Sequence, residues 1–240
     1  MIEAVISDFG GVLTSPLLDS FAAFQDSSGI SLEHLGLAMA AIWKRDGANP
    51  LFELETGRMS ESDFLRTLGQ ELTRQLGKPV ELHGFGDRYF EHLHPNERMI
   101  EYMRNLRGRG YRLAICTNNV REWEPLWRAK LPVDELFDVV VDSAFVGSRK
   151  PEHRIYEITL ERLGVPASEA LFIDDVELNC EVARELGMEA IWFRSSEQAI
   201  AEAEAQLSSP SRSQQYSSRH SLASSMHRAS ESQGSTVSNA

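Results

Sequence analysis

Short apolar runs recur along the chain, and from the second run onward each is separated from the next by a segment of helical character. The runs are Ala4-Val5-Ile6, Leu113-Ala114-Ile115, Val139-Val140-Val141, Leu171-Phe172-Ile173 and Ala190-Ile191-Trp192-Phe193. Continuous apolar runs are typical of parallel strands that are buried on both faces, and helical segments between them are typical of crossover connections. The pattern therefore predicts an α/β fold with a doubly wound, Rossmann-like parallel sheet.

Helix boundaries are marked by capping residues. Helices are predicted to start at Pro95-Asn96-Glu97, at Pro151-Glu152 and at Ser60-Glu61-Ser62-Asp63, where the last has the spacing of a capping box. Glycines are predicted to end helices at Gly108 or Gly110, at Gly164 and at Gly187. These signals agree with the alternation of strands and helices.

A long helical segment interrupts this rhythm between Val12-Leu13 and the strand that follows Tyr111. Helices are predicted at about 18–27, 31–45, 60–76, 84–93 and 96–108, without a convincing strand. We therefore expect residues 15–95 to form an inserted, all-helical cap. The catalytic core would then consist of residues 1–14 and 96–207.

Composition adds limits on the class of protein. The 240 residues carry a formal net charge of −12 and include two cysteines, Cys116 and Cys180, too few for a disulfide scaffold. The acidic balance argues against nucleic acid as a partner. No apolar run spans a membrane and no secretory signal is readable, so we expect a soluble, cytoplasmic protein with reduced thiols that does not bind membranes.

The last segment differs from the rest of the chain. Residues 208–240 contain 13 serines and almost no large apolar side chains. Such a composition cannot bury enough apolar surface to fold, so residues 208–240 are expected to form a disordered, Ser-rich tail.

Polar side chains follow the predicted strands at four places. The segments are Asp8-Phe9-Gly10-Gly11, Thr117-Asn118-Asn119, Gly147-Ser148-Arg149-Lys150-Pro151 and Asp174-Asp175. In a doubly wound sheet, ligands bind outside the carboxyl ends of the strands. A single aspartate at such a position is usually a turn former, but four polar segments at successive strands point to one shared crevice.

Phosphoryl transfer requires this set of side chains. Carboxylates provide the hard oxygen ligands that Mg²⁺ prefers, and a carboxylate can also attack phosphorus to form an aspartyl phosphate. A lysine and the cation would neutralise the phosphoryl oxygens while hydroxyl and amide groups donate hydrogen bonds to them. Two adjacent carboxylates, Asp174 and Asp175, repel each other unless a cation lies between them, which further favours Mg²⁺.

On these motifs the sequence resembles the haloacid dehalogenase-like (HAD) hydrolase superfamily, and the resemblance covers essentially all of residues 1–200. The matching segments are Asp8-Phe9-Gly10-Gly11-Val12-Leu13-Thr14, Cys116-Thr117-Asn118-Asn119, Gly147-Ser148-Arg149-Lys150-Pro151-Glu152 with Ile155-Tyr156, and Phe172-Ile173-Asp174-Asp175 with Asn179 and Ala183-Leu186-Gly187. The chain looks most similar to a phosphatase branch. That branch includes the amino-terminal phosphatase domain of soluble epoxide hydrolase, the amino-terminal domains of certain acyl-CoA dehydrogenase fusions, and bacterial sugar-1-phosphate phosphatases.

The resemblance implies roles for individual residues. Asp8 would be the nucleophile and a Mg²⁺ ligand, and Lys150 would hold the nucleophile and the phosphate together. Thr117 and Asn118 would bind phosphate. Asp175 would ligate Mg²⁺, the backbone carbonyl of Gly10 would supply a further ligand, and Asp174 would act directly or through water, with Asn179 as a weaker candidate. The implied function is a Mg²⁺-dependent phosphomonoesterase for a small phosphorylated metabolite, with a helical cap over the site.

One position departs from the family pattern. Most phosphatases of this superfamily carry a second aspartate two residues after the nucleophile, as the general acid and base, and here that residue is Gly10. Losing such a group costs about 10²–10⁴-fold in rate. The substrate would then carry a good leaving group, as a sugar 1-phosphate or an acyl phosphate does. Alternatively, His83, His92, His94 or a carboxylate of the cap would replace the missing group.

Two other functions stay open at this stage. The chain would be a binding or regulatory module for phosphorylated ligands if Gly10 has removed useful turnover. It would be a 2-haloacid dehalogenase if it used Asp8 without a metal, although the acidic pair argues against that chemistry. In the predicted cap, Trp43 with Lys44, Arg45 and Arg58 would either hold substrate or serve packing and solvation. Just after Asn119, Trp123 and Trp127 would border the pocket, support a contact with the cap or a partner, or pack in the core.

Overall fold

The computed structural model describes residues 1–16, 25, 29–82 and 84–208. Within this part of the chain lies a five-stranded sheet with the order β3-β2-β1-β4-β5, and all neighbouring strands are parallel. The strands are β1 (Ala4–Ser7), β2 (Arg112–Thr117), β3 (Val139–Asp142), β4 (Ala170–Asp174) and β5 (Glu189–Trp192). The predicted α/β class, the parallel sheet and the five strand positions are confirmed.

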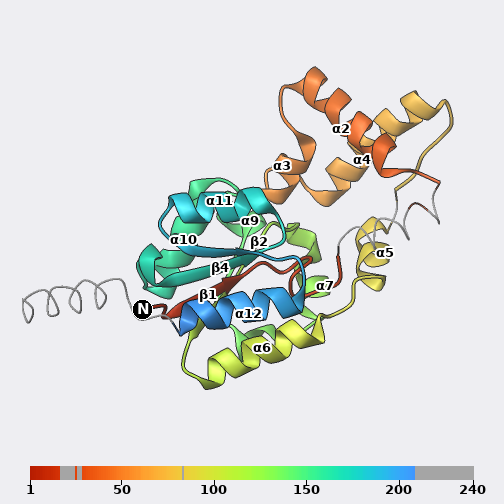
Figure 1. Cartoon of the computed structure of the whole chain (residues 1–240). Helices are drawn as coiled ribbons and strands as arrows, with labels where there is room; N and C mark the ends of the chain where they lie inside the picture. The colour runs from red at the N-terminus through yellow and green to blue at the C-terminus, as the bar shows by residue number, and fades with distance from the viewer. Residues whose placement is uncertain (17–24, 26–28, 83, 209–240) are drawn as a thin grey trace, which may run out of the picture.

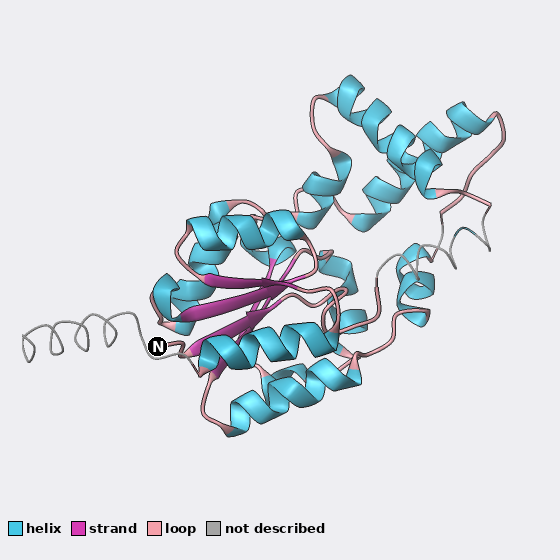
Figure 2. Cartoon of the chain, viewed as in Figure 1, coloured by secondary structure: helices cyan, strands magenta, loops and turns pink. Residues whose placement is uncertain are grey.

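Helices cover both faces of this sheet (Figures 1 and 2). On one face, α6 (Glu97–Gly108) contacts β2 and α12 (Ser196–Leu207) contacts β5. On the other face, α10 (His153–Leu163) contacts β2 and β3 while α11 (Glu177–Glu185) contacts β4 and β5. The connections also contain the shorter elements η1 (Arg121–Trp123), α7 (Glu124–Arg128), α8 (Val133–Leu136), α9 (Ser143–Val146) and η2 (Ala167–Glu169).

The apolar runs explain this layering, because successive side chains of a strand point to opposite faces. In β1, Val5 belongs to the apolar cluster that contains Met103 of α6, whereas Ile6 belongs to the cluster that contains Ile155 of α10. Both side chains are almost completely buried. A strand that is apolar on both faces is therefore required here, as expected for a sheet covered on both sides.

Residues 32–76 form three helices that lie beside the sheet rather than on either face (Figure 1). These are α2 (Leu32–Asp46), α3 (Pro50–Glu55) and α4 (Glu61–Leu76), which pack against one another and are called the helical unit below. The Ser31 hydroxyl caps α2 and the Ser60 hydroxyl caps α4. A further helix, α5 (Phe85–Glu91), packs against α7.

Four of the five predicted helices in this region are confirmed within a few residues. The predicted helix at 18–27 lies outside the described residues except for Gln25. The short helix α3 was not predicted, although Asn49 caps it and Pro50 occupies its first turn. The predicted tail also lies outside the described residues, apart from Ser208.

The chain leaves and re-enters the sheet domain at neighbouring points. Thr14 and Pro95 form an isolated antiparallel bridge. Next to it, the Ser15 amide donates to the His94 carbonyl at 2.7 Å, and the Asn96 amide donates to the Leu13 carbonyl at 2.9 Å. The two connecting segments are thus held side by side at the base of the helical region.

Two further expectations concern the described residues as a whole. Cys116 and Cys180 are both free and buried. Among the helices that the structure describes, none is long and apolar enough to span a membrane.

Candidate active site

The four polar segments meet at the carboxyl edge of the sheet. Asp8 directly follows β1, Thr117 ends β2 and Asp174 ends β4. Because β1 lies between β2 and β4, these three side chains come from adjacent strands. Lys150 reaches the same place from the loop between α9 and α10. The sheet order therefore brings together residues that are far apart in the sequence.

A buried lysine bridges two aspartates at this edge. The Lys150 Nζ lies 2.8 Å from Asp8 Oδ1 and 2.6 Å from Asp174 Oδ2. The side chain of Lys150 is 1% exposed, and that of Asp174 is completely buried. A charge this deeply buried requires compensating partners, and here the two carboxylates provide them.

Asp174 is held from several directions. Its Oδ1 accepts hydrogen bonds from the Val176 amide at 2.8 Å and from Asn179 Nδ2 at 3.0 Å, while its Oδ2 accepts from Lys150. Both oxygens are thus engaged by the protein. In this arrangement Asp174 orients Lys150, and Asn179 in turn orients Asp174.

The carboxylates form one oxygen-rich cluster. Oxygens of Asp8, Asp174 and Asp175 all lie within 4.8 Å of one another. Such a cluster of hard oxygen donors fits Mg²⁺. Among the described residues, these three aspartates are the group of Asp, Glu, His or Cys side chains whose ligand atoms lie close enough together to hold one metal ion.

The pKa values of the cluster follow from burial and mutual repulsion. Burial raises the pKa of the Asp8 carboxyl, and the charges of Asp174 and Asp175 add to this effect while Lys150 opposes it. Burial, reinforced by Asp174, raises the pKa of Asp175 to about 6. Burial by itself would lower the pKa of Lys150, but Asp174 and Asp8 outweigh it and raise that pKa above its usual range. The cluster therefore holds more negative charge than one lysine neutralises, which a divalent cation would relieve.

Two consecutive glycines, Gly10 and Gly11, follow Asp8 and Phe9. Gly11 has a φ of +76°, and a Cβ at this position would lie 2.2 Å from Asp175 Oδ2. Only glycine allows both this backbone conformation and this close approach. Gly10 is buried and lines the cavity beside Asp8, but its lack of a side chain leaves no acid or base there.

Thr117 and Asn118 lie at the same edge but differ in their contacts. Thr117 is buried and its hydroxyl donates weakly, at 3.4 Å, to the Asn118 carbonyl. Asn118 Oδ1 accepts from the Lys150 amide at 2.7 Å, and its Nδ2 donates to the Lys150 carbonyl at 2.9 Å. The Asn118 side chain thus holds the backbone of Lys150, a contact that the sequence does not reveal.

The helical unit reaches the site through α3. Glu55 Oε2 lies 2.6 Å from Arg149 Nε, and both side chains are largely buried, at 16% and 14% exposed. The Arg149 guanidinium also stacks on the Phe52 ring at 3.9 Å from its centroid. Burial raises the pKa of Glu55, and Arg149 opposes this rise. Arg149 lies in a motif recognised from the sequence, but its partners on α3 do not.

A cavity of about 390 Å³ lies over the cluster. Asp8, Gly10, Thr117, Asn118, Lys150 and Asp175 line it, together with Asn179, Glu55, Trp123 and many apolar side chains. Asp174 lies behind this lining and contacts Lys150. The sequence-predicted residues are therefore gathered around one cavity.

Most of the other candidates do not face this cavity, whereas Trp123 and Glu55 do. His92 and His94 are exposed and are absent from its lining, and His83 lies outside the described residues. Trp43 is 54% exposed and does not line the cavity either. Arg58 pairs with Glu53 on the surface. Trp127 is completely buried in the core, whereas Trp123 borders the cavity. Glu55 is the carboxylate that α3 presents to it.

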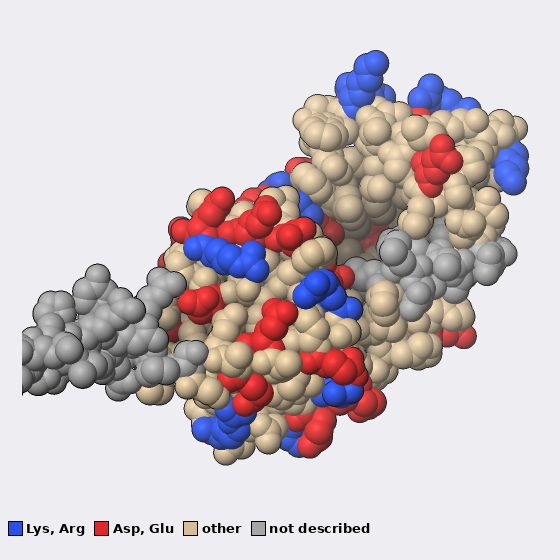
Figure 3. Space-filling view, viewed as in Figure 1, with Lys and Arg blue, Asp and Glu red and all other residues tan. Residues whose placement is uncertain are grey.

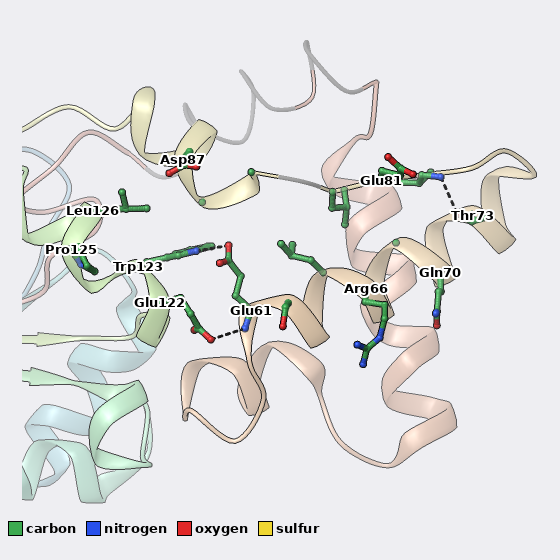
Figure 4. A pocket seen from close by; sticks show the side chains of 17 residues that line it. Glu61, Arg66, Gln70, Thr73, Glu81, Asp87, Glu122, Trp123, Pro125 and Leu126 are labelled. Atoms are coloured by element: carbon green, nitrogen blue, oxygen red, sulfur yellow. Dashed lines mark hydrogen bonds between the residues drawn. The ribbon is translucent and has the colours of Figure 1, made fainter.

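A second cavity, of about 850 Å³, lies between α4 and α5 (Figure 4). Trp123 and Leu65 line both cavities and so separate them. Across it, Trp123 Nε1 donates to Glu61 Oε1 at 2.7 Å, and the Glu61 amide donates to Glu122 Oε1 at 3.1 Å. These bonds join the start of α4 to the sheet domain, while the polar cluster described above lies in the first cavity.

Comparison with known proteins gives a family match. Residues 2–187 match the model of a haloacid dehalogenase-like hydrolase. The chain is 34% identical to phosphatase MT3486 of Mycobacterium tuberculosis, over 79% of this chain and 86% of that protein. It is 28% identical to sesquiterpene phosphatase astK of Aspergillus oryzae, over 81% of this chain and 91% of that protein. It is 30% identical to acyl-CoA dehydrogenase family member 10 of Mus musculus over 87% of this chain, but spans only 19% of that relative.

Solved structures share the fold. A HAD family enzyme from Bacteroides thetaiotaomicron, crystallised with magnesium and inorganic phosphate, superposes with a TM-score of 0.59 at 22% identity, over 80% of this chain and 93% of that one.

Proposed function

The chain belongs to the haloacid dehalogenase-like hydrolases, and from this premise we propose that it is a Mg²⁺-dependent phosphomonoesterase that acts through a phospho-Asp8 intermediate. The observation that carries the proposal is the cluster at the sheet edge, where Lys150 bridges Asp8 and Asp174 beside a third carboxylate, Asp175. Two relatives named as phosphatases support the same type of reaction.

In the first step, an Asp8 carboxylate oxygen attacks phosphorus and the bond from phosphorus to the leaving oxygen breaks. The leaving group departs with the electron pair of that bond, and the phosphoryl group becomes attached to Asp8. In the second step, water attacks the phosphorus, Asp8 is regenerated and inorganic phosphate leaves. Each step is an in-line displacement that depends on positioning and on neutralising charge.

The chain offers Asp8, Asp175 and the Gly10 carbonyl as ligands for Mg²⁺, with Asp174 nearby. When bound, the ion would neutralise charge on the phosphoryl oxygens. Lys150 supplies a fixed positive charge next to the nucleophile, because Asp174 and Asn118 hold its side chain and its backbone. Thr117 would donate its hydroxyl to the phosphate, whereas Asn118 would contribute through its backbone, since its side chain is engaged with Lys150.

Gly10 restricts the substrate. Without a carboxyl group at this position, nothing there protonates the leaving oxygen, so leaving groups that need no proton are favoured. Sugar 1-phosphates and acyl phosphates meet this condition. We further propose that residues 15–95 act as the cap that excludes water from the cavity, because α3 and α5 supply part of its lining.

The proposal is tested by measuring phosphate release by the full chain from acetyl phosphate, glucose 1-phosphate and phenyl phosphate, each with Mg²⁺ and with EDTA. We expect turnover that requires Mg²⁺ and favours the first two substrates. Absence of release from all three would contradict a phosphatase and support a module that only binds phosphorylated ligands.

Replacing the nucleophile tests the covalent step. Asp8→Asn is expected to lower kcat at least 10³-fold while the fold and phosphate binding persist, because an amide is not nucleophilic. The matched control is Asp134→Asn on α8, whose side chain is 90% exposed and does not line the cavity. Turnover by Asp8→Asn at the parent rate would disprove the phospho-Asp8 intermediate.

A further inference from the structure

The cavity has two chemically different sides. The side formed by the ends of the strands and the adjoining segments contributes most of the polar groups, among them Asp8, Thr117, Asn118, Lys150 and Asp175. The side formed by the helices is mainly apolar: besides Glu55, it contributes Leu35, Met39, Leu51, Leu54, Phe64, Leu65, Leu68, Phe85, Tyr89, Phe90 and Leu93. A phosphate bound at the cluster would therefore place its organic group against an apolar wall.

An aromatic group contributes part of this wall. The ring of Trp123 stacks on Phe85 with 5.9 Å between centroids and on Tyr89 with 5.5 Å, and it meets Phe90 edge-on at 5.6 Å. Such packing fixes the rings in place. The wall is thus preformed and presents rigid, apolar surface.

The charged group on the helical side is already paired. Glu55, the charged residue that the described part of this side presents to the cavity, binds Arg149 at 2.6 Å. A substrate with several hydroxyl groups would bury them against leucine and phenylalanine side chains. Each hydroxyl left without a partner costs about 1–3 kcal/mol, so this wall disfavours a sugar.

The two parts of the molecule also differ in surface charge. In Figure 3, Asp, Glu, Lys and Arg gather densely over the sheet domain, whereas the face of the helical unit toward the viewer shows few of them. A volume of about 390 Å³ lies within the usual range of small-molecule sites, about 300–1,000 Å³.

From these observations we infer that the substrate is a phosphate whose organic group is a hydrocarbon chain, held by the apolar wall that α2, α3, α4 and α5 form over the Asp8 cluster. This inference rests on the proposed phosphatase function for the reaction, but the binding that it requires is independent of turnover. Of the substrates considered above, a long-chain acyl phosphate meets both requirements. Its leaving group needs no proton, as the absence of a carboxyl group at Gly10 demands, and its hydrocarbon chain fits the apolar wall.

Binding is tested with methyl-, hexyl- and decylphosphonate, whose carbon–phosphorus bond is not hydrolysed, by calorimetry on the full chain with Mg²⁺ and below the micelle concentration. Burying a methylene contributes about 0.8 kcal/mol. We therefore expect affinity to rise about fourfold per methylene until the cavity is filled. Equal affinity for the three phosphonates would overturn the inference.

Turnover is measured in parallel with acetyl, hexanoyl and decanoyl phosphate. Each releases a carboxylate, and the three carboxylates have nearly the same basicity. A kcat/KM that rises with chain length supports the inference. Hydrolysis of all three at the same kcat/KM would overturn it and leave the phosphatase intact. Chain-dependent phosphonate binding without any hydrolysis would support the hydrocarbon ligand and refute the phosphatase.

Two variants of α2 provide a matched pair. Met39 lines the cavity, whereas Leu37 on the same helix is 56% exposed and does not. Met39→Gln is expected to weaken decylphosphonate binding at least fivefold and to flatten the dependence on chain length. Leu37→Gln is expected to preserve that dependence, and equal effects of the two substitutions would argue against the wall.

Discussion

At the scale of the residue, Gly11 connects backbone conformation to the metal cluster. Its positive φ is needed where the chain turns after β1, and the missing side chain makes room for the Asp175 carboxylate. Most glycines with a positive φ meet only the first requirement. Gly47, with a φ of +77°, has no atom within 4 Å of a built Cβ. A substitution at Gly47 therefore introduces backbone strain alone, whereas one at Gly11 introduces backbone strain and steric crowding.

Gly11→Ala and Gly47→Ala are expected to differ in activity rather than only in stability. Both force alanine into the left-handed region, which costs about 1–2 kcal/mol. In Gly11→Ala the new methyl group must also displace Asp175, so we expect Mg²⁺ affinity and kcat to fall by at least tenfold. Denaturant unfolding and Mg²⁺ titration of both variants measure the two effects. Normal Mg²⁺ affinity in Gly11→Ala would mean that Asp175 is not a ligand.

Asp175 also predicts how Mg²⁺ binding depends on pH. Without the metal its pKa is raised from 3.8 to about 6. Because the folded protein binds this proton more tightly than the unfolded chain, the contribution of Asp175 to stability is lost as the pH rises through about 6. Mg²⁺ requires the ionised carboxylate, so its affinity is expected to fall as the pH drops through the same range.

Calorimetry at pH 6 in two buffers of different ionisation enthalpy measures this coupling. We expect Mg²⁺ binding to release protons at pH 6 and to release fewer at pH 8. Asp175→Asn should abolish the part of the proton release that comes from this residue. Equal proton release at both pH values would exclude Asp175 as the linked group.

At the scale of the element, the strands were predictable because each contains a short run of successive apolar residues, and polar segments that end in turn residues follow most of these runs. Helices α2 and α4 were predictable from their caps and their periodicity. Helix α3 escaped prediction because its six residues are too few to show a helical period, although Asn49 and Pro50 mark its start. Short elements of this kind depend on tertiary contacts.

The features of the site also differ in whether the sequence predicts them. Asp8, Lys150 and the acidic pair were predictable because each directly follows a strand or belongs to a local motif. The pairing of Glu55 with Arg149 joins residues 94 positions apart. The two hydrogen bonds between the Asn118 side chain and the backbone of Lys150 span 32 positions. Neither contact has a local signal, since each depends on how loops and α3 meet in space.

The Glu55–Arg149 pair is expected to couple α3 to the sheet domain. Removing either partner leaves a largely buried charge without compensation. A double-mutant cycle with Glu55→Gln and Arg149→Met should therefore give a coupling energy of about 1–3 kcal/mol in unfolding free energy. We also expect kcat/KM to fall in each single variant, because α3 lines the cavity.

The exposed pair of Arg154 and Glu161 on α10 serves as the control for this cycle. Its side chains are 55% and 61% exposed and lie 2.9 Å apart. Solvent-exposed pairs contribute at most about 1 kcal/mol. A coupling energy for Glu55 and Arg149 as small as that of the control pair would show that the contact does not fasten α3.

At the scale of the whole molecule, one apolar cluster extends from the helical unit into the sheet domain. It contains Leu35 of α2 and Leu68 of α4 as well as Leu113 of β2 and Ala203 of α12. The cavity lies within this continuous apolar region, with the charged cluster at its floor. Changes in the helical unit are thus expected to alter both substrate binding and overall stability.

The same apolar cluster indicates where the chain can be shortened without loss of stability. Helix α12 buries Ala199, Ala203 and Leu207 in it, and the Ser196 hydroxyl bonds the Asn96 side chain. A protein ending at Leu207 keeps all of these contacts. We therefore expect residues 1–207 to match the full chain in unfolding free energy within about 0.5 kcal/mol and to match it in kcat/KM. Thermal unfolding and phosphate release measure both quantities.

A second truncation, ending at Arg194, is the matched control because it removes α12 and uncovers apolar surface on α6 and β5. Burial of large apolar side chains contributes about 1.5–3 kcal/mol each, so the loss of Leu207 and the two alanines should destabilise the protein by several kcal/mol. Reduced activity in residues 1–207 at unchanged stability would assign a role in catalysis to residues 208–240. Equal stability of the two truncated proteins would instead show that α12 does not complete the core.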